Sequence, residues 1–209
     1  MNKRFLLYSA FFMVLVAVFF YALTRFIPGF ADVKLPVISY VQPFSFIDQD
    51  GRTISEREVN GKVYVAEYFF TTCKGICPKM NTNMKKVYHA FSNEKNFLIM
   101  SHTVDPLVDS VGRLKQYADS LKISSSQWHF LTGRKDSLYR AARVSYLLDD
   151  PKNSNEKIDD QFIHTQYFAL VDRRGRVRKI YDGLKNDEIA ELTKDINELL
   201  NEKGTDSEL

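Results

Sequence analysis

The sequence is poor in cysteine and has almost no excess of charge of either sign. Lysine and arginine together number 29, against 26 aspartates and glutamates, and this balance gives no electrostatic reason to expect a nucleic acid partner. Only two cysteines occur among 209 residues, so no third thiol is available for the usual kind of structural zinc site. Internal repeats and long low-complexity tracts are also lacking, which favours one ordinary folded domain.

Charged residues are absent from Phe5 to Leu23, where phenylalanine, valine and leucine dominate. A helix rises about 1.5 Å per residue, so this stretch covers close to the ~30 Å hydrocarbon core of a bilayer. The stretch is longer than the apolar part of a typical secretory signal, and no convincing small-x-small cleavage site follows it. We therefore predict an uncleaved, single-pass transmembrane helix over residues 5–24.

The residues before the span predict its orientation. Lys3 and Arg4 precede it, so the positive-inside rule keeps residues 1–4 in the cytoplasm. Too few residues precede the span for an Arg-rich mitochondrial presequence. We therefore expect the bacterial inner (cytoplasmic) membrane, with the soluble domain facing the periplasm or the cell exterior. The remaining predicted parts are a proline-containing stalk at 25–43, a folded domain at 44–203 and a tail at 204–209.

Apolar patterns predict strands that alternate with helices along the domain. Residues 63–70 are β-branched or aromatic at nearly every position, as expected of a central strand covered on both faces. A cysteine loop follows at 71–78, and then a helix begins near Pro78. The other predicted elements are a hairpin turning at 50–51, strands at 97–104 and 127–133, helices at 109–121 and 137–146, a closing hairpin at 166–181 and a C-terminal helix at 184–200. This order predicts an α/β domain with a central mixed sheet flanked by helices, and it resembles a thioredoxin-like fold.

The two cysteines lie together, as Cys73-x-x-x-Cys77, between the central strand and the helix that follows it. Two thiols at this separation can share one thiophilic metal ion or close as a disulfide. The helix N-terminus and the nearby Lys74 and Lys79 favour thiolates, so we expect lowered pKa values for both cysteines. Thioredoxin-like redox pairs usually have two residues between the cysteines. The three residues found here are a departure from that pattern.

Two thiolates leave a bound metal ion short of ligands, so a third ligand has to come from elsewhere in the chain. The candidates are the four histidines, His89, His102, His129 and His164. We interpret His89 as a surface residue, and His102 and His129 as packed or hydrogen-bonded residues of predicted strands. His164 lies at a loop-to-strand junction that is near the cysteine loop in a thioredoxin-like fold, but its spacing alone leaves a ligand role open. Helical spacing places the methionines that follow the cysteines in the core rather than at the metal.

Several motifs, in a fixed order, carry a resemblance to a known family. They are Thr72–Pro78 with its C-x-x-x-C-P pattern, Ser101–Asp109 with V-D-P, Leu114–Ala118, Trp128–Gly133, and Ile163–Asp172 with the late histidine. In this order and spacing they resemble the Sco/SenC family over nearly the whole soluble domain. Two positions depart from the family pattern, since Lys74 stands where proline is common and Ile163 where aspartate is common.

The resemblance implies a function in copper handling. Members of that family are membrane-tethered, thioredoxin-like copper proteins that help to assemble the binuclear copper centre of cytochrome c oxidase. Carried over position by position, the expected copper ligands are Cys73, Cys77 and His164. Two thiolates and one imidazole suit Cu(I), and the same set can hold Cu(II) with an added oxygen ligand. The expected partner is the copper-centre subunit of a terminal oxidase, and a thiol reductant or another copper chaperone are further candidate partners.

Other uses of the cysteine pair stay open. The main alternative is a thiol-disulfide oxidoreductase that acts on the cysteines of a periplasmic partner without an obligatory metal. A peroxidase is less well supported, because no dedicated base stands beside the thiols. A disulfide that only staples the loop is disfavoured, because a domain of this size with an apolar central strand does not need one. Copper delivery and thiol reduction are therefore both retained, and with them the question of enzymatic activity.

Overall fold

The computed structural model describes residues 3–26, 35–124, 126–150, 152, 157–158 and 161–202. The chain divides into an N-terminal unit that ends at Leu35 and a domain that begins at Pro36. Residues 27–34 of the predicted stalk and the predicted tail at 204–209 lie outside the described residues.

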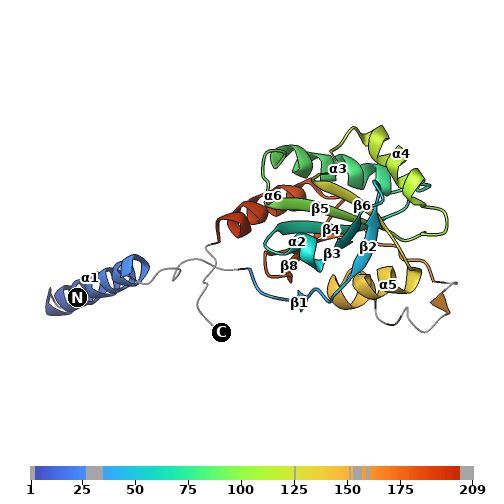
Figure 1. The fold of residues 1–209 in the computed structure, drawn as a ribbon. Helices are drawn as coiled ribbons and strands as arrows, with labels where there is room; N and C mark the ends of the chain where they lie inside the picture. The colour runs from blue at the N-terminus through green and yellow to red at the C-terminus, as the bar shows by residue number, and fades with distance from the viewer. Residues whose placement is uncertain are drawn as a thin grey trace. The chain divides into compact units, whose positions relative to one another are not determined.

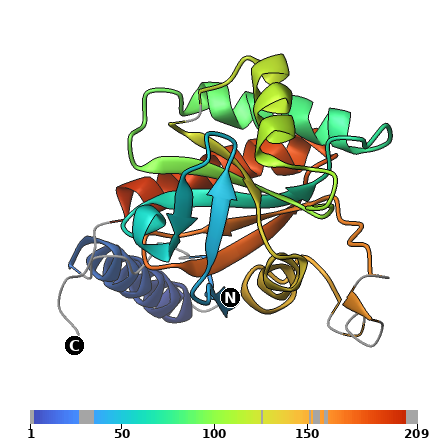
Figure 2. The same ribbon diagram turned by 45° about the vertical axis from the view of Figure 1, so that its right-hand side comes forward.

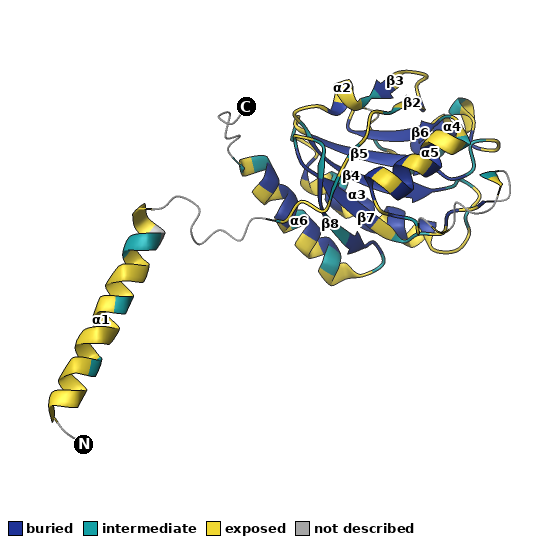
Figure 3. Cartoon of the chain, turned by 90° about the horizontal axis from the view of Figure 1, so that it is seen from below, coloured by how far each residue is buried: buried dark blue, intermediate teal, exposed yellow. Residues whose placement is uncertain are grey.

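The described part of the N-terminal unit is helix α1, Lys3–Phe26 (Figure 1). Between Lys3 and Leu23 this helix is long and apolar enough to cross a membrane, by length and composition. Figure 3 shows that most of its residues are exposed, and large apolar side chains are among them. An apolar surface of this extent is unfavourable in water and suits a bilayer.

The domain is built on one mixed sheet, which contains eight strands among the described residues (Figures 1 and 2). The strand order is β1-β8-β7-β4-β5-β6-β2-β3. The strands are β1 Ser39–Tyr40, β2 Ser45–Asp48, β3 Thr53–Ser55, β4 Val63–Phe69, β5 Phe97–Thr103, β6 Trp128–Thr132, β7 Tyr167–Val171 and β8 Arg176–Asp182. Strand β5 runs parallel to β4 and to β6, and every other described pair is antiparallel. The predicted mixed sheet and both predicted hairpins are therefore confirmed.

The first strand lies within the segment predicted as a stalk, residues 25–43. Ser39 and Tyr40 pair with Val177 and Arg176 of β8. The backbone N–H of Val41 also donates to the carbonyl of Gly175. This part of the segment is therefore hydrogen-bonded to the edge of the sheet.

Helices cover both faces of the sheet. Figures 1 and 2 show α3, α4 and α6 on one face and α5 on the other. The helices of the domain are α2 Glu56–Val59, α3 Cys77–Ala90, α4 Val111–Leu121, α5 Lys135–Arg140 and α6 Asn186–Asn201. A π-helical turn, Ala141–Ser145, continues α5 directly. The one helix predicted at 137–146 is thus an α-helix followed by this turn.

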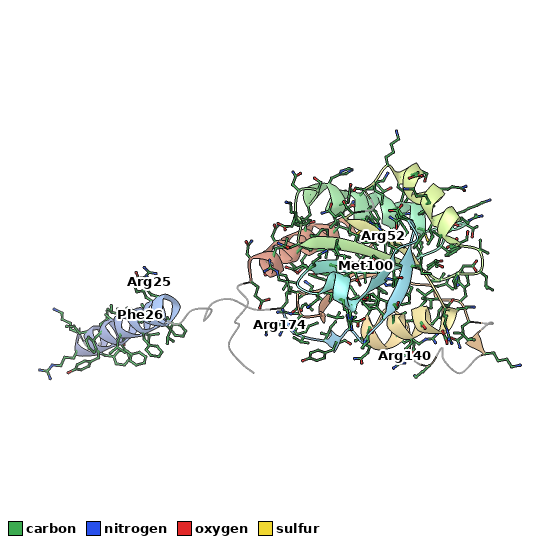
Figure 4. The ribbon with its side chains drawn as sticks, in the orientation of Figure 1. Arg25, Phe26, Arg52, Met100, Arg140 and Arg174 are labelled. Carbon is green, nitrogen blue, oxygen red and sulfur yellow. The ribbon has the colours of Figure 1, made fainter. Side chains whose placement is uncertain are left out.

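The central strand β4 is buried along its whole length. Successive side chains of a strand point to opposite faces, so a strand between two layers of helices has to be apolar at both parities. Its neighbour β5 is buried in the same way, and Met100, labelled in Figure 4, lies beside Ala66 of β4. This burial at both parities is the pattern that the sequence predicts for a central strand.

Glu67 is the one carboxylic acid of β4, and it is buried together with the rest of the strand. The hydroxyl of Ser101 donates to its Oε1 at 2.5 Å, and Trp128 Nε1 donates to Ser101 Oγ at 2.8 Å. Burial raises the pKa of Glu67 from 4.5 to about 7, although the hydrogen bond from Ser101 opposes the shift. The carboxyl group is therefore protonated in the folded domain at mildly acidic pH.

We expect this buried carboxyl group to make the stability of the domain depend on pH. Between pH 4.5 and about 7 the folded chain keeps a proton that the unfolded chain releases, so the free energy of unfolding falls as the pH rises through this window. The full loss is on the order of 3 kcal/mol. Urea unfolding of the full chain in detergent, followed by the fluorescence of Trp128, measures it.

The variant Glu67→Gln carries no ionisable group at this position, so it lacks this part of the pH dependence. The variant Glu198→Gln, on the exposed side of α6, is the matched control and keeps the wild-type profile. Identical profiles for the wild-type chain and Glu67→Gln would contradict the prediction.

Candidate metal centre

The topology of the sheet brings two distant parts of the chain together. Strand β7 is antiparallel to β4, with Ala169 beside Ala66. The N-terminal end of β7 therefore lies beside the C-terminal end of β4. The cysteine loop leaves β4 at Phe70, and the segment that carries His164 leads into β7 at Tyr167. Both segments consequently meet at the same edge of the sheet.

The cysteine loop places both thiols at the start of α3. The backbone N–H of Cys73 donates to the carbonyl of Phe70 at 3.2 Å. Cys77 is the first residue of α3, and Pro78 follows it in the first turn, where the missing N–H of proline costs no helical hydrogen bond. Both cysteines are free thiols, and they lie close enough for each to shift the pKa of the other.

The pKa values of the two thiols are shifted in opposite directions. Burial raises the pKa of Cys73, but hydrogen bonds from the Cys77 thiol and from the loop backbone outweigh it, and the net pKa is lowered. Burial also raises the pKa of Cys77, which is only 4% exposed, and the hydrogen bond to Cys73 raises it further. Our expectation of a lowered pKa at both positions is therefore wrong for Cys77. Its burial outweighs the favourable position at the helix N-terminus.

A buried carboxylate, Asp109, holds the first half of the cysteine loop. It accepts hydrogen bonds from the hydroxyl and the backbone N–H of Thr71 and from the hydroxyl of Thr103. The Arg113 side chain donates to the same Thr71 hydroxyl at 2.6 Å. A carboxylate without exposure to water needs such partners, since its burial is otherwise very costly. The start of the loop is thereby tied to the end of β5.

A pocket of about 350 Å³ opens beside the cysteine loop. Its lining includes Cys73, Cys77 and His164, together with Val104 and Ile163. The structure thus brings the three residues predicted as ligands to one pocket. His164 is exposed there. Among the described residues, no three Cys, His, Asp or Glu side chains already form a ligand cluster.

The other three histidines lie away from this pocket. His102 is fully buried in β5, and burial lowers its pKa to about 4. His129 is buried in β6, where its Nδ1 lies 3.3 Å from Asp48 Oδ2. His89 is exposed near the end of α3. Our interpretation of these residues as sheet and surface histidines agrees with their positions.

The residues that hold the site are less apparent in the sequence than those that line it. Asp109 follows the V-D-P motif by three residues, but the sequence does not indicate that its carboxylate binds the cysteine loop. Asp105, in the same motif, caps the turn after β5 through its carbonyl, which accepts the N–H groups of Val108 and Asp109. Asp105 thus forms the turn that ends β5. Met80 and Met84 are buried in the core, as predicted.

A mixed sheet that carries two free thiols between its central strand and the following helix defines a thioredoxin-like protein. The model of the SCO1/SenC family matches residues 35–201. The chain therefore belongs to the SCO1/SenC family.

Individual relatives agree with this assignment. The "SCO1 protein homolog" of Bacillus subtilis (strain 168) is 34% identical over 170 residues, which are 80% of this chain and 86% of that protein. A solved structure of BsSco, described as a member of the Sco family of cytochrome c oxidase assembly proteins with a disulfide switch, matches with a TM-score of 0.68. It is 31% identical and covers 82% of this chain and 99% of its own. A "putative copper-binding protein" of Stutzerimonas stutzeri is 25% identical over 146 residues, which are 69% of this chain and 70% of that protein.

We expect the two thiols to differ in reactivity. Cys73 is partly exposed and has the lower pKa, whereas Cys77 is buried and has the higher one. At pH 7.5 iodoacetamide should therefore alkylate Cys73 at least about tenfold faster than Cys77 in the reduced, metal-free chain. Mass spectrometry of peptides after short pulses of reagent measures both rates. In Cys73→Ser, Cys77 should stay slow, because its burial is the main cause of its high pKa. Equal alkylation rates of Cys73 and Cys77 in the wild-type chain would contradict the prediction.

Proposed function

We propose that this protein is a membrane-anchored copper chaperone that binds copper through Cys73, Cys77 and His164. In this proposal it assists the assembly of the binuclear copper centre of cytochrome c oxidase. The observation that carries the proposal is the pocket at the end of β4, which is lined by both thiols and by His164. Membership of the SCO1/SenC family supports it, since a relative in this family is described as a cytochrome c oxidase assembly protein.

The donor set fits copper better than other common metal ions. Thiolates are soft ligands that select Cu(I), and one imidazole completes a three-coordinate set. Cu(II) needs one more ligand, which an oxygen atom can provide. A structural zinc site normally has four protein ligands, whereas the proposed set has three.

The acidities of the thiols support the uptake of a metal ion that is later released. The lowered pKa of Cys73 makes its thiolate available as the first ligand. The proton on Cys77 has to leave when the metal binds, so binding is coupled to the release of a proton. His164 is exposed at the pocket and the cysteines are not yet clustered with it. A ligand set of this kind suits a metal ion that is bound and later passed to a partner protein.

The proposed partners follow from the anchor and the pocket. Helix α1 would hold the domain at the bacterial inner membrane, facing the periplasm or the cell exterior, where the copper-centre subunit of the oxidase is accessible. The partly exposed Cys73 would be the sulfur that an incoming ligand of the oxidase subunit reaches first. A thiol reductant or another copper chaperone would restore the reduced or the loaded state.

Copper titration of the full chain in detergent tests the proposed ligands. The wild-type chain should bind one copper ion. Loss of an outer-shell partner of a metal ligand already costs roughly 10–100-fold in affinity, so loss of a ligand should cost at least about a hundredfold. Cys73→Ala, Cys77→Ala and His164→Ala should each show this loss, measured by competition with a chromophoric Cu(I) chelator. The control His89→Ala changes an exposed histidine elsewhere on α3 and should bind as the wild-type chain does. Undiminished affinity in His164→Ala would remove His164 from the set.

The second candidate function is thiol-disulfide exchange with a partner protein. The proximity of the two free thiols favours it, because each lies near enough to shift the pKa of the other. The Cys73 thiolate would attack a disulfide of the partner and release one partner thiolate. The Cys77 thiolate would then attack Cys73 Sγ and release the second. The partner would gain two electrons, and this chain would be left with a Cys73–Cys77 disulfide.

Replacement of the chromosomal gene by the His164→Ala variant separates the two functions. Thiol exchange needs no distant imidazole, whereas the proposed copper site does. If the protein acts by carrying copper, His164→Ala should be as deficient in assembled oxidase copper centre as Cys73→Ser. Membrane spectra and metal analysis measure the centre, and immunoblots confirm equal amounts of each variant. Normal oxidase in His164→Ala together with deficient oxidase in Cys73→Ser would favour the exchange reaction.

A further inference from the structure

The segment that carries His164 has an unusual attachment to the domain. Residues 161–166 belong to no helix or strand, and β7 begins only at Tyr167. The C-terminal side of the segment is fixed where the backbone N–H of Gly183 donates to the carbonyl of Gln166 at 2.8 Å. On the other side of His164 no sheet pairing is present among the described residues, so other contacts have to position the histidine.

The hydroxyl of Tyr139 provides such a contact. Tyr139 lies on α5, and its side chain is fully buried. Its hydroxyl donates to the carbonyl of Val104 at 2.8 Å and lies 3.2 Å from the carbonyl of Gln161. The backbone of Ile163 also lies near enough to lower the pKa of this hydroxyl, against the effect of burial. One oxygen atom thus joins α5, the end of β5 and the residues just before His164.

Apolar contacts at the same place hold the side chains. Ile163 is 3% exposed and belongs to the same core cluster as Tyr139 and Val104. The ring of Phe162 packs edge-on against Phe70, at the start of the cysteine loop, with the ring centroids 5.1 Å apart. The centroid of the Phe162 ring also lies 4.9 Å from that of the His164 imidazole. The backbone that Tyr139 holds therefore carries a ring that contacts both Phe70 and His164.

The ring of Tyr139 is held independently of its hydroxyl. Lys135 and Arg143 place their cationic groups over it, at 5.3 and 5.5 Å from its centroid. Cation–π contacts of this kind stay when the hydroxyl oxygen is removed. Tyr139→Phe therefore removes the hydrogen bonds to the His164 segment and keeps the packing of the ring.

We propose that Tyr139 is a positioning residue that holds the His164 segment at the pocket and so raises the affinity for copper without contacting the metal. The proposal rests on the proposed function, because it takes His164 as a copper ligand. In this proposal the Tyr139 hydroxyl positions only His164, the third ligand. The cysteine pair, which is held by Asp109 through Thr71, does not depend on it.

Hydrogen exchange of the metal-free full chain tests the positioning role by itself. Loss of one buried hydrogen bond should speed the exchange of amides in a peptide that covers residues 161–166 by roughly fivefold in Tyr139→Phe. The matched control is Tyr181→Phe, which removes another buried hydroxyl, one that donates to Asp195 at 2.7 Å. It should leave this peptide unchanged. Unchanged exchange in Tyr139→Phe would overturn the proposal, whether or not the chain binds copper.

Copper affinity tests the consequence for the site. Tyr139→Phe should weaken Cu(I) binding by about tenfold, as expected for an outer-shell partner of a ligand. In a chain that already carries His164→Ala it should cause no further loss. The midpoint potential of the Cys73–Cys77 pair, measured in thiol-disulfide buffers, should stay at the wild-type value.

The outcomes separate a failure of the positioning role of Tyr139 from a failure of the proposed copper function. An equal loss of affinity from Tyr139→Phe in the presence and absence of His164, or a shifted potential of the cysteine pair, would mean that Tyr139 acts on the domain in general, and the proposal would be overturned. A wild-type chain that binds no copper would instead refute the proposed function, and with it the role of Tyr139 in affinity.

Discussion

The structure depends on the burial of β4 on both faces. A strand covered on both sides has to be central, and here it pairs with the parallel β5 and the antiparallel β7. Because β5 is parallel to β4, the chain has to cross over through α3, and a loop is required at the C-terminal end of β4. Because β7 is antiparallel to β4, it begins at that same end. The cysteine loop and His164 are therefore neighbours because of strand direction, although some 90 residues separate them in the sequence.

Polar groups inside the domain hold the segments that line the candidate metal site. Asp109 accepts hydrogen bonds from Thr71 and Thr103, and the Tyr139 hydroxyl contacts the backbone carbonyls of Val104 and Gln161. Each is buried, so each has to satisfy its hydrogen-bonding capacity within the protein. Their positions are thereby well defined, and their hydrogen bonds fix the backbone of the cysteine loop and of the His164 segment. Cys73 and His164 can then stay accessible to solvent while buried residues hold the backbone around them.

The sequence predicted the framework better than the details of the site. Strands β4 and β5 and helix α3 were predictable because their apolar residues follow the period of a strand or a helix. The cysteine pair was evident because only three residues separate its members. His164, in contrast, was selected by a family resemblance rather than by its spacing. The raised pKa of Cys77 and the contacts of Asp109 and Tyr139 depend on burial and on partners far along the chain. Local patterns contain no information about such contacts.

The approach of Gly183 to Gln166 restricts which sequences can build this site. A Cβ atom at position 183 would lie 2.7 Å from the Gln166 carbonyl oxygen and 2.5 Å from the ring of Phe168. Both neighbours would have to move, and the carbonyl belongs to the backbone two residues after His164. Even the smallest side chain at this position would therefore shift the strand that begins beyond the histidine. A position outside the pocket lining thus has glycine as its only fitting residue, because any larger residue there would displace the backbone that leads away from His164.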